Sequence, residues 1–169
     1  DKFINDYFLN VKKTVDKIPQ EKIFKLVNYV RQCYTQDKKV FLFGNGGSAS
    51  TASHIATDWS KGVFAQQPKK LKVISLADNV SLITAWANDT EYKYIFKEQI
   101  FALADYGDMM VGLSGSGRSL NVLLAIDSAR EHGHVAFGIL GTGGGNIKSY
   151  CTDSIIIPSD DMQIIEDCH

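Results

Sequence analysis

The chain has 169 residues, of which 44% are hydrophobic and 22% charged, a composition that excludes a disordered or collagen-like protein. Its 18 basic and 19 acidic side chains leave a formal net charge of −1, which argues against a protein that binds the phosphate backbone of nucleic acids. No apolar run approaches the roughly 18–20 residues that cross a bilayer. No charged and apolar leader is recognised, although the sequence does not begin with Met, so a longer gene product is left open.

The three cysteines are Cys33, Cys151 and Cys168, and no two of them have CxxC spacing. An odd number without that spacing argues against a disulfide framework and against a structural zinc knuckle. We therefore expect buried free thiols in a cytoplasmic protein, without nucleic-acid or membrane partners.

The first 37 residues have the periodicity of helices. From Asp1 to Val15, apolar side chains recur near helical spacing, and Pro19 interrupts the pattern. A second apolar stripe begins after Gln20 and continues to Tyr34. The sequence therefore predicts an N-terminal helical segment over residues 1–37.

Residues 38–158 alternate between short apolar runs and stretches of helical length. The runs are rich in β-branched and aromatic residues, as are strands buried on both faces. Five such strands separated by helices predict an α/β fold: a three-layer α/β/α sandwich around a five-stranded parallel sheet of doubly wound type. Because no linker interrupts the chain, a single domain over residues 1–169 is predicted. The predicted strands are 39–43, 72–76, 109–113, 134–140 and 154–157, and the most evident helices are 48–60, 92–104, 120–131 and 162–169.

Two segments of small residues follow the first and third strands, and each leads into a helix. They are Gly44–Ser50 (GNGGSAS) and Ser114–Ser119 (SGSGRS). Glycines let the backbone approach an anion, helix N-termini favour negative charge, and serine hydroxyls add donors. With the strand order 2-1-3-4-5, both segments flank one crevice at the switch point of the sheet. We therefore predict one phosphate-bearing ligand, held chiefly by Ser114, Ser116 and Ser119.

A dinucleotide site is the competing interpretation of the first segment. Gly44, Gly46 and Ala49 match the G-x-G-x-x-A pattern, and Asp78 after the second strand is a candidate ribose acceptor. However, Asp78 lies further from Gly44 than the usual spacing of about 20 residues. This interpretation also gives the serine-rich segment no role.

Two pairs of acidic and imidazole side chains have helical spacing. His54 and Asp58 lie at i and i+4, and Glu166 and His169 lie at i and i+3. Such groups suit general acid–base catalysis or the binding of a divalent metal such as zinc. Ordinary solvated helices carry similar pairs, so spacing alone leaves both interpretations open. The segment Gly141–Gly145 is likewise compatible with a site edge or a flexible turn.

Together these segments resemble the phosphoheptose isomerases of the sugar isomerase (SIS) domain superfamily. The resemblance extends to His169 and is carried by FGNGGSASTASHIATD, AWANDTEY, VGLSGSGRSLNV and IPSDDMQIIEDCH. It implies a flavodoxin-like core, a homotetramer with sites between subunits, and one zinc ion per site. The implied activity is isomerisation of sedoheptulose 7-phosphate to D-glycero-D-manno-heptose 7-phosphate, a precursor of lipopolysaccharide or capsule.

The resemblance also implies roles for individual residues. His54, Asp58 and Glu166 would bind the metal. Asp58 would be the catalytic base, and His169 is a candidate second catalytic group. The implied substrate-binding residues are Asn45, Gly46, Gly47, Ser48, Asp58, Asn88, Asp89, Ser114, Gly115, Ser116, Ser119 and Glu166.

The sequence departs from the family pattern at three positions. Asp58 stands in place of a glutamate, and the shorter side chain displaces a base by more than about 1 Å, enough to affect proton abstraction. Glu166 stands in place of a glutamine and adds a negative charge. His169 matches a nearby histidine and not the family's second catalytic histidine, which lies about one turn further on.

Three functions therefore remain open at this point. The first is an aldose–ketose isomerase that works through an enediol, with Asp58 as the base. The second is a non-catalytic phosphosugar-binding or adaptor protein, which the departures at Asp58 and Glu166 would favour. The third is a SIS isomerase that acts on another sugar phosphate.

Overall fold

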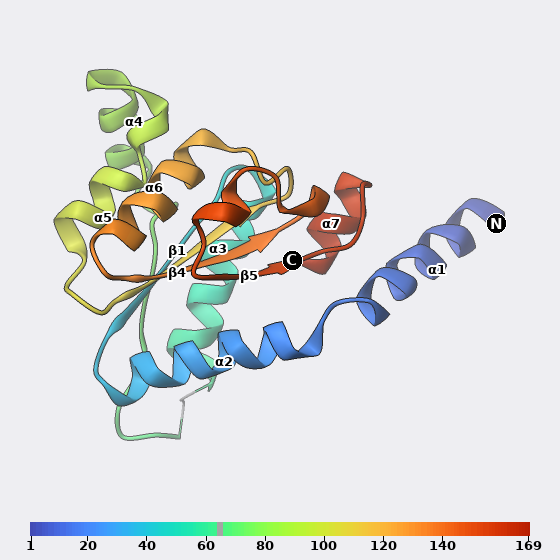
Figure 1. Cartoon of the computed structure of the whole chain (residues 1–169), viewed down its shortest axis with the longest axis horizontal. Helices are drawn as coiled ribbons and strands as arrows, with labels where there is room; N and C mark the ends of the chain where they lie inside the picture. The colour runs from blue at the N-terminus through green and yellow to red at the C-terminus, as the bar shows by residue number, and fades with distance from the viewer. Residues whose placement is uncertain (64–65) are drawn as a thin grey trace.

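The protein is built around a parallel sheet (Figure 1), and the structure, a computed structural model, describes residues 1–63 and 66–169. Within these residues the sheet has five strands in the order β2-β1-β3-β4-β5, which confirms the predicted order. The chain leaves β1 for β2 on one side and returns to β3 on the other, so the switch point lies between β1 and β3. The strands are β1 (Lys39–Phe43), β2 (Lys72–Ser75), β3 (Met109–Ser114), β4 (Val135–Leu140) and β5 (Asp153–Ile156).

The helices follow the predicted alternation with three differences. The helix expected over 48–60 ends at Thr57 and passes into a π-helix over Asp58–Val63. The helix expected over 92–104 is a 3-10 turn, Tyr92–Tyr94, followed by a short α-helix, because aromatic and β-branched residues at its start favour helix weakly. A further helix lies between β2 and this turn. The α-helices are α1 (Lys2–Asp16), α2 (Gln20–Thr35), α3 (Gly47–Thr57), α4 (Val80–Asp89), α5 (Lys97–Leu103), α6 (Leu120–Glu131) and α7 (Met162–Cys168).

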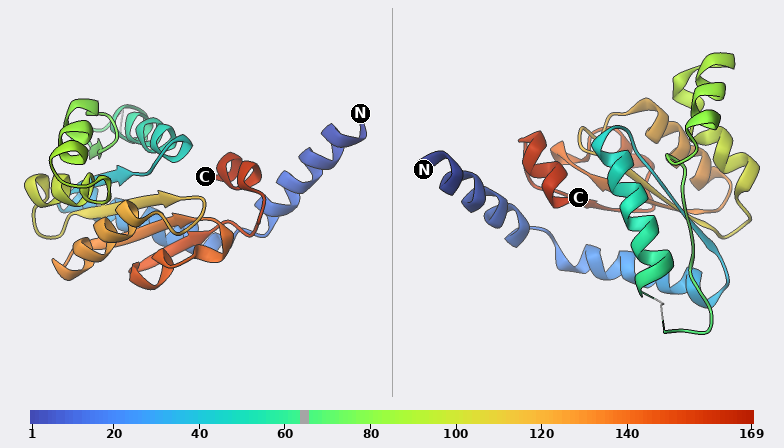
Figure 2. Two further views of the ribbon diagram at one scale, coloured as in Figure 1. Left: turned by 90° about the horizontal axis from the view of Figure 1, so that it is seen from above. Right: turned by 180° about the vertical axis from the view of Figure 1, so that it is seen from behind.

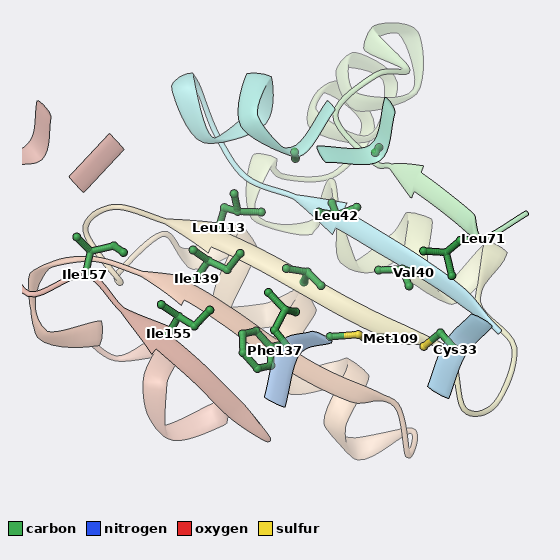
Figure 3. Packing of buried hydrophobic residues seen from close by; sticks show 14 of the residues in the cluster. Cys33, Val40, Leu42, Leu71, Met109, Leu113, Phe137, Ile139, Ile155 and Ile157 are labelled. Atoms are coloured by element: carbon green, nitrogen blue, oxygen red, sulfur yellow. The ribbon is translucent and has the colours of Figure 1, made fainter. Parts of the chain in front are cut away.

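Helix layers cover both faces of the sheet. One core contains Leu26 and Cys33 of α2 and Ala52 and Ala56 of α3, which pack on the apolar side chains of the strands. Figure 3 shows these strand side chains pointing to the same face of the sheet. The second core joins α5 and α6 to the opposite face. The predicted three-layer arrangement is therefore confirmed.

A glycine allows α6 to approach the central strand. A Cβ added at Gly112 of β3 would lie 2.9 Å from Cγ1 of Val122 and 3.1 Å from Cγ1 of Ile126, both on α6. Gly112 lies beside Phe43, the last residue of β1, so β3 extends past the end of β1. This close packing holds the start of α6 next to the first loop.

Helix α2 is fastened to the edge strand by ion pairs. Lys22 Nζ lies 2.6 Å from Oδ1 of Asp153 and Lys25 Nζ lies 2.8 Å from its Oδ2, while the Asp153 side chain is 8% exposed. Burial opposes ionisation of this carboxyl, but hydrogen bonds from the two lysines and from the Ser154 N–H outweigh it and lower its pKa to about 2.

Helix α1 extends away from the sheet, with α7 beside it (Figures 1 and 2), and the Tyr7 hydroxyl donates to the Asp167 carboxylate. Much of the apolar surface of α1 and α2 is uncovered. Exposed apolar patches of this kind mark interaction surfaces. Among the described helices, none is both long and apolar enough to span a bilayer. The exposed apolar residues are Phe3, Ile4, Phe8, Leu9 and Val15 on α1 and Ile23, Phe24 and Val27 on α2.

Candidate functional site

The first loop leaves β1 and turns into α3 beside the central strand. Gly46 has a φ of +55°, a left-handed conformation that favours glycine, and directly precedes the helix. A Cβ added at Gly44 would lie 2.9 Å from the Leu113 carbonyl oxygen and 2.7 Å from the Ser48 Cβ. The loop therefore passes close to the end of β3. Ser48, a predicted substrate-binding residue, is buried in the first turn of α3.

The second loop gathers three hydroxyl groups at the N-terminus of α6. Ser114 Oγ lies 3.2 Å from Ser119 Oγ and 3.5 Å from Ser116 Oγ, and the Arg118 N–H donates to Ser116 Oγ at 3.2 Å. Ser119 is the N-cap residue of α6 but makes no side-chain capping bond, so its hydroxyl is not used by the helix. Hydroxyl donors next to a helix N-terminus are suited to a phosphate group. The predicted convergence of these three serines is present.

The two loops meet through a pair of side-chain amides. Asn45 Nδ2 donates to Asn121 Oδ1 at 2.9 Å, and Asn121 Nδ2 donates to Asn45 Oδ1 at 2.8 Å. Asn45 lies in the first loop, and Asn121 lies in the first turn of α6, two residues after Ser119. The loops therefore share one end of the sheet, as the strand order requires.

The glycine segment Gly141–Gly145 supports the serine loop. Thr142 Oγ1 donates to the Gly115 carbonyl at 3.1 Å, and the Gly141 N–H donates to the Ser114 carbonyl at 3.1 Å. A Cβ added at Gly117 would lie 2.4 Å from the Gly144 carbonyl carbon. The segment is thus packed against the loop and is not an independent turn.

Helix α7 brings Glu166 to the first loop. A Cβ added at Gly47 would lie 3.2 Å from Oε2 of Glu166, so this carboxylate covers the start of α3. On the same helix, Met162 and Ile165 pack against Gly115 of the serine loop. The Asp161 carboxylate caps α7 through the Gln163 N–H at 2.9 Å. The terminal helix therefore closes the site from a third side.

His54 and Asp58 form the predicted pair but lie away from the loops. His54 Nε2 is 3.3 Å from Asp58 Oδ2, and the two side chains are 78% and 65% exposed. The 11 residues of α3 carry Asp58 about 16 Å along the helix axis from the first loop. Within one chain the pair is thus separated from the first loop by the length of α3, and its role at the site stays a prediction.

The predicted zinc ligands are only partly assembled. Zinc takes three or four protein ligands, and His54 with Asp58 supplies two. Glu166 contacts Gly47, at the opposite end of α3. In the part of the chain that the structure describes, no group of three or more His, Cys, Asp and Glu residues could hold a metal ion. The donor set of one chain therefore does not fit a zinc ion.

Asn88 and Asp89 lie in the last turn of α4, and both are exposed. Asn88 Nδ2 donates to Asp89 Oδ1 at 2.9 Å. The chain then continues to Tyr92, whose hydroxyl donates to Asn45 Oδ1 at 2.9 Å. The predicted sugar-binding pair therefore lies three residues before a tyrosine that is hydrogen-bonded to the first loop.

His169 lies in an apolar pocket. Its imidazole is among side chains of α2, α3 and the sheet, including Leu26, Ile55 and Ile139. Among the described residues neither buried ring nitrogen has a hydrogen-bond partner within normal geometry, and burial lowers the pKa of the ring, partly offset by the backbone carbonyl of Leu140. Its catalytic role stays a prediction.

Asp78 is engaged by α3. The Ser53 hydroxyl donates to the Asp78 carboxylate and lies 3.2 Å from the Ser75 hydroxyl. Asp78, the candidate ribose acceptor of the dinucleotide interpretation, is thus already hydrogen-bonded to Ser53. Nothing in these contacts favours a dinucleotide over a phosphosugar.

Comparison with known proteins gives a consistent result. A family model described as SIS domain matches residues 5–141. The chain is 41% identical over 149 residues to the phosphoheptose isomerase of Clostridium acetobutylicum. This alignment covers 88% of this chain and 76% of that protein. The fold is similar to a phosphoheptose isomerase from Francisella tularensis (TM-score 0.89, 27% identity) and to one from Neisseria gonorrhoeae (TM-score 0.88, 28% identity). Both alignments cover 98% of this chain and 90% of the other.

Proposed function

The chain belongs to the phosphoheptose isomerase family of SIS-domain proteins, and from this we propose that it interconverts sedoheptulose 7-phosphate and D-glycero-D-manno-heptose 7-phosphate. The reaction would supply heptose for surface polysaccharides. The observation that carries the proposal is the meeting of the two loops through Asn45 and Asn121 beside three clustered serine hydroxyls. That arrangement provides donors for a phosphate on one side and amide groups for a sugar on the other.

The phosphate end of the substrate binds at the serine loop. Ser114, Ser116 and Ser119 donate to its oxygens, and the positive end of the α6 dipole favours its charge. The phosphate does not react, so its binding energy serves to position the carbon chain for the chemical step.

The chemical step is a proton transfer between neighbouring carbons. In the direction from ketose to aldose, a base removes a proton from C1, and the electron pair moves toward the C2 carbonyl to give an enediolate. The proton is returned to C2, and the O1 proton moves to the negatively charged O2, so that C1 becomes the aldehyde and C2 carries a hydroxyl. We assign Asp58 as the base, with His54 at 3.3 Å as its partner.

The complete site takes residues from more than one chain in this proposal. Asp58 lies about 16 Å along α3 from the first loop, too far to act on a sugar whose phosphate is held by its own serine loop. The exposed apolar side chains of α1 and α2 provide surfaces for the association. We propose a homotetramer with sites between subunits.

A zinc ion belongs to the assembled protein in the proposal. His54 and Asp58 of one chain would contribute two ligands, and a further chain would contribute the rest. The expected zinc content is one ion per chain in the tetramer and none in a His54→Ala variant, measured by metal analysis. A cytoplasmic location is proposed as well, where the thiols of Cys33, Cys151 and Cys168, all free, remain reduced.

The test of the proposed function is the Asp58→Asn variant, assayed by NMR with sedoheptulose 7-phosphate. Removal of a general base is expected to lower kcat by about 10²–10⁴-fold and to leave the affinity for inorganic phosphate unchanged. The matched control is Asp127→Asn, which breaks an exposed ion pair with Arg130 on α6 and should keep full activity. Undiminished turnover of Asp58→Asn would remove Asp58 from the role of base.

A further inference from the structure

Three side chains that meet at the first loop form a closed hydrogen-bond network. Asn45 and Asn121 exchange two amide bonds, and the Tyr92 hydroxyl adds a third bond, to Asn45 Oδ1, at 2.9 Å. Asn121 is 2% exposed and is surrounded on α6 by fully buried apolar residues such as Val122 and Ala125. A polar side chain at such a position is costly unless its hydrogen bonds are satisfied.

The orientation of each amide in this network follows from one backbone group. The Val122 N–H can only donate, and it lies 2.9 Å from one amide atom of Asn121, which must therefore be the oxygen. The other amide atom of Asn121 is then the nitrogen, and it donates to Asn45. The atom of Asn45 that receives this bond must be its oxygen, and the Tyr92 hydroxyl donates to the same oxygen.

The network leaves Asn45 with one free group of defined polarity. Its Oδ1 accepts two hydrogen bonds, which fills both lone pairs, and one Nδ2 hydrogen is used by Asn121 Oδ1. Among the described residues, no partner contacts the second N–H of the half-buried Asn45 amide. Asn45 can therefore donate to a ligand but cannot accept from one.

We infer that Asn121 and Tyr92 are positioning residues that hold the Asn45 amide as a donor to an oxygen atom of the sugar. The inference rests on the proposed function for the identity of the ligand as a phosphosugar. It goes beyond that function because it assigns a role to two residues and a direction to the hydrogen bond. The remaining N–H can donate to a hydroxyl, carbonyl or enediolate oxygen of the sugar, and the bond to a charged enediolate oxygen is the strongest of these.

The experiment is a set of double-mutant cycles. Tyr92→Phe removes one hydrogen bond from a side chain that is 56% exposed, so the fold should be retained. We expect kcat/KM for sedoheptulose 7-phosphate to fall about three- to tenfold, the range of one neutral hydrogen bond, with the inhibition constant of inorganic phosphate unchanged. Asn121→Asp still accepts from Val122 and Asn45 but cannot donate to Asn45 Oδ1, and a larger loss is expected. Tyr106→Phe, at a tyrosine that is 79% exposed, is the matched control and should have no effect.

The decisive comparison repeats these variants in an Asn45→Ala background. If Tyr92 and Asn121 act through Asn45, each substitution changes kcat/KM by less than about twofold in that background. Equal losses with and without Asn45, or a parallel loss of phosphate affinity, would overturn the inference. If the unmodified protein shows no turnover, the proposed function fails. The same double-mutant cycles are then measured by calorimetry, as dissociation constants of sedoheptulose 7-phosphate and of inorganic phosphate. Additive effects there would overturn the inference independently.

Discussion

The Gly117→Ala variant tests whether the glycine segment Gly141–Gly145 holds the serine loop in shape. Gly117 has a φ of +63°, and an added Cβ would lie 2.4 Å from the Gly144 carbonyl carbon and oxygen. The backbone of Gly144 must therefore move. Gly143 provides a matched control, because its φ is +69° and its added Cβ would meet no atom of the described residues within 4 Å.

The two variants share the backbone strain and differ in the clash. A Cβ in the left-handed conformation costs about 1–2 kcal/mol, which is the expected loss for Gly143→Ala. The clash adds about 1–3 kcal/mol, so Gly117→Ala is expected to lose about 2–5 kcal/mol. For a chain of this size, 1 kcal/mol lowers Tm by about 2–4 °C, and thermal unfolding will separate the two variants.

Phosphate binding gives the second readout. Displacement of Gly144 also moves Gly141 and Thr142, which donate hydrogen bonds to the carbonyls of Ser114 and Gly115. Gly117→Ala should therefore weaken the binding of inorganic phosphate, measured by calorimetry. Gly143→Ala should change the dissociation constant of inorganic phosphate by less than about twofold, which corresponds to about 0.4 kcal/mol. Equal Tm losses and equal phosphate affinities for the two variants would refute the role of the glycine segment as a support.

Three further predictions concern other parts of the molecule. The Asp153 carboxylate has a pKa of about 2 in the fold, below its ordinary 3.8, so its pairing with the lysines of α2 stabilises the fold above about pH 4. That contribution, about 1–2 kcal/mol, should be lost as the pH falls from about 4 to 2, and the difference in unfolding free energy between wild type and Asp153→Asn should shrink in that window; a constant difference would contradict it. Ser114→Ala should weaken phosphate binding about tenfold or more, the value of one hydrogen bond to a charged group, whereas Ser149→Ala on an exposed turn should not; equal affinities would exclude Ser114 as a ligand of the phosphate. Phe8→Glu places a charge on the exposed face of α1 and should shift the protein toward monomers in light-scattering measurements, while an unchanged mass would place the interface elsewhere.

The fold was predictable because its sequence signals are local. Each strand is a short apolar run, and the central strand β3 is buried at every residue, so the pattern needed no knowledge of its neighbours. Helix α6 occupies the predicted 120–131 because Ser119 and the preceding glycines define its start. Helix α4 was not among the predicted helices, since its ten residues include no fully buried side chain and so give a weak periodic signal.

The site was predictable only in part. The serine cluster and the His54–Asp58 pair depend on spacing within one segment, and both are present. The Asn45–Asn121 pair joins positions 76 residues apart, and no local pattern reports such a contact. A polar residue two positions after the serine loop, directly before the apolar run Val122–Ile126, is the one signal that would have drawn attention to Asn121. Tyr92 carries no comparable signal in the sequence.

The most direct measurement of the central claim is NMR of sedoheptulose 7-phosphate incubated with the protein in D₂O. An isomerase that works through an enediol should produce the aldose heptose 7-phosphate with deuterium at C2, because the proton taken from C1 exchanges with solvent before it is returned. Saturable binding of the sugar phosphate with neither aldose formation nor deuterium incorporation would contradict the isomerase and would favour a protein that only binds phosphosugars.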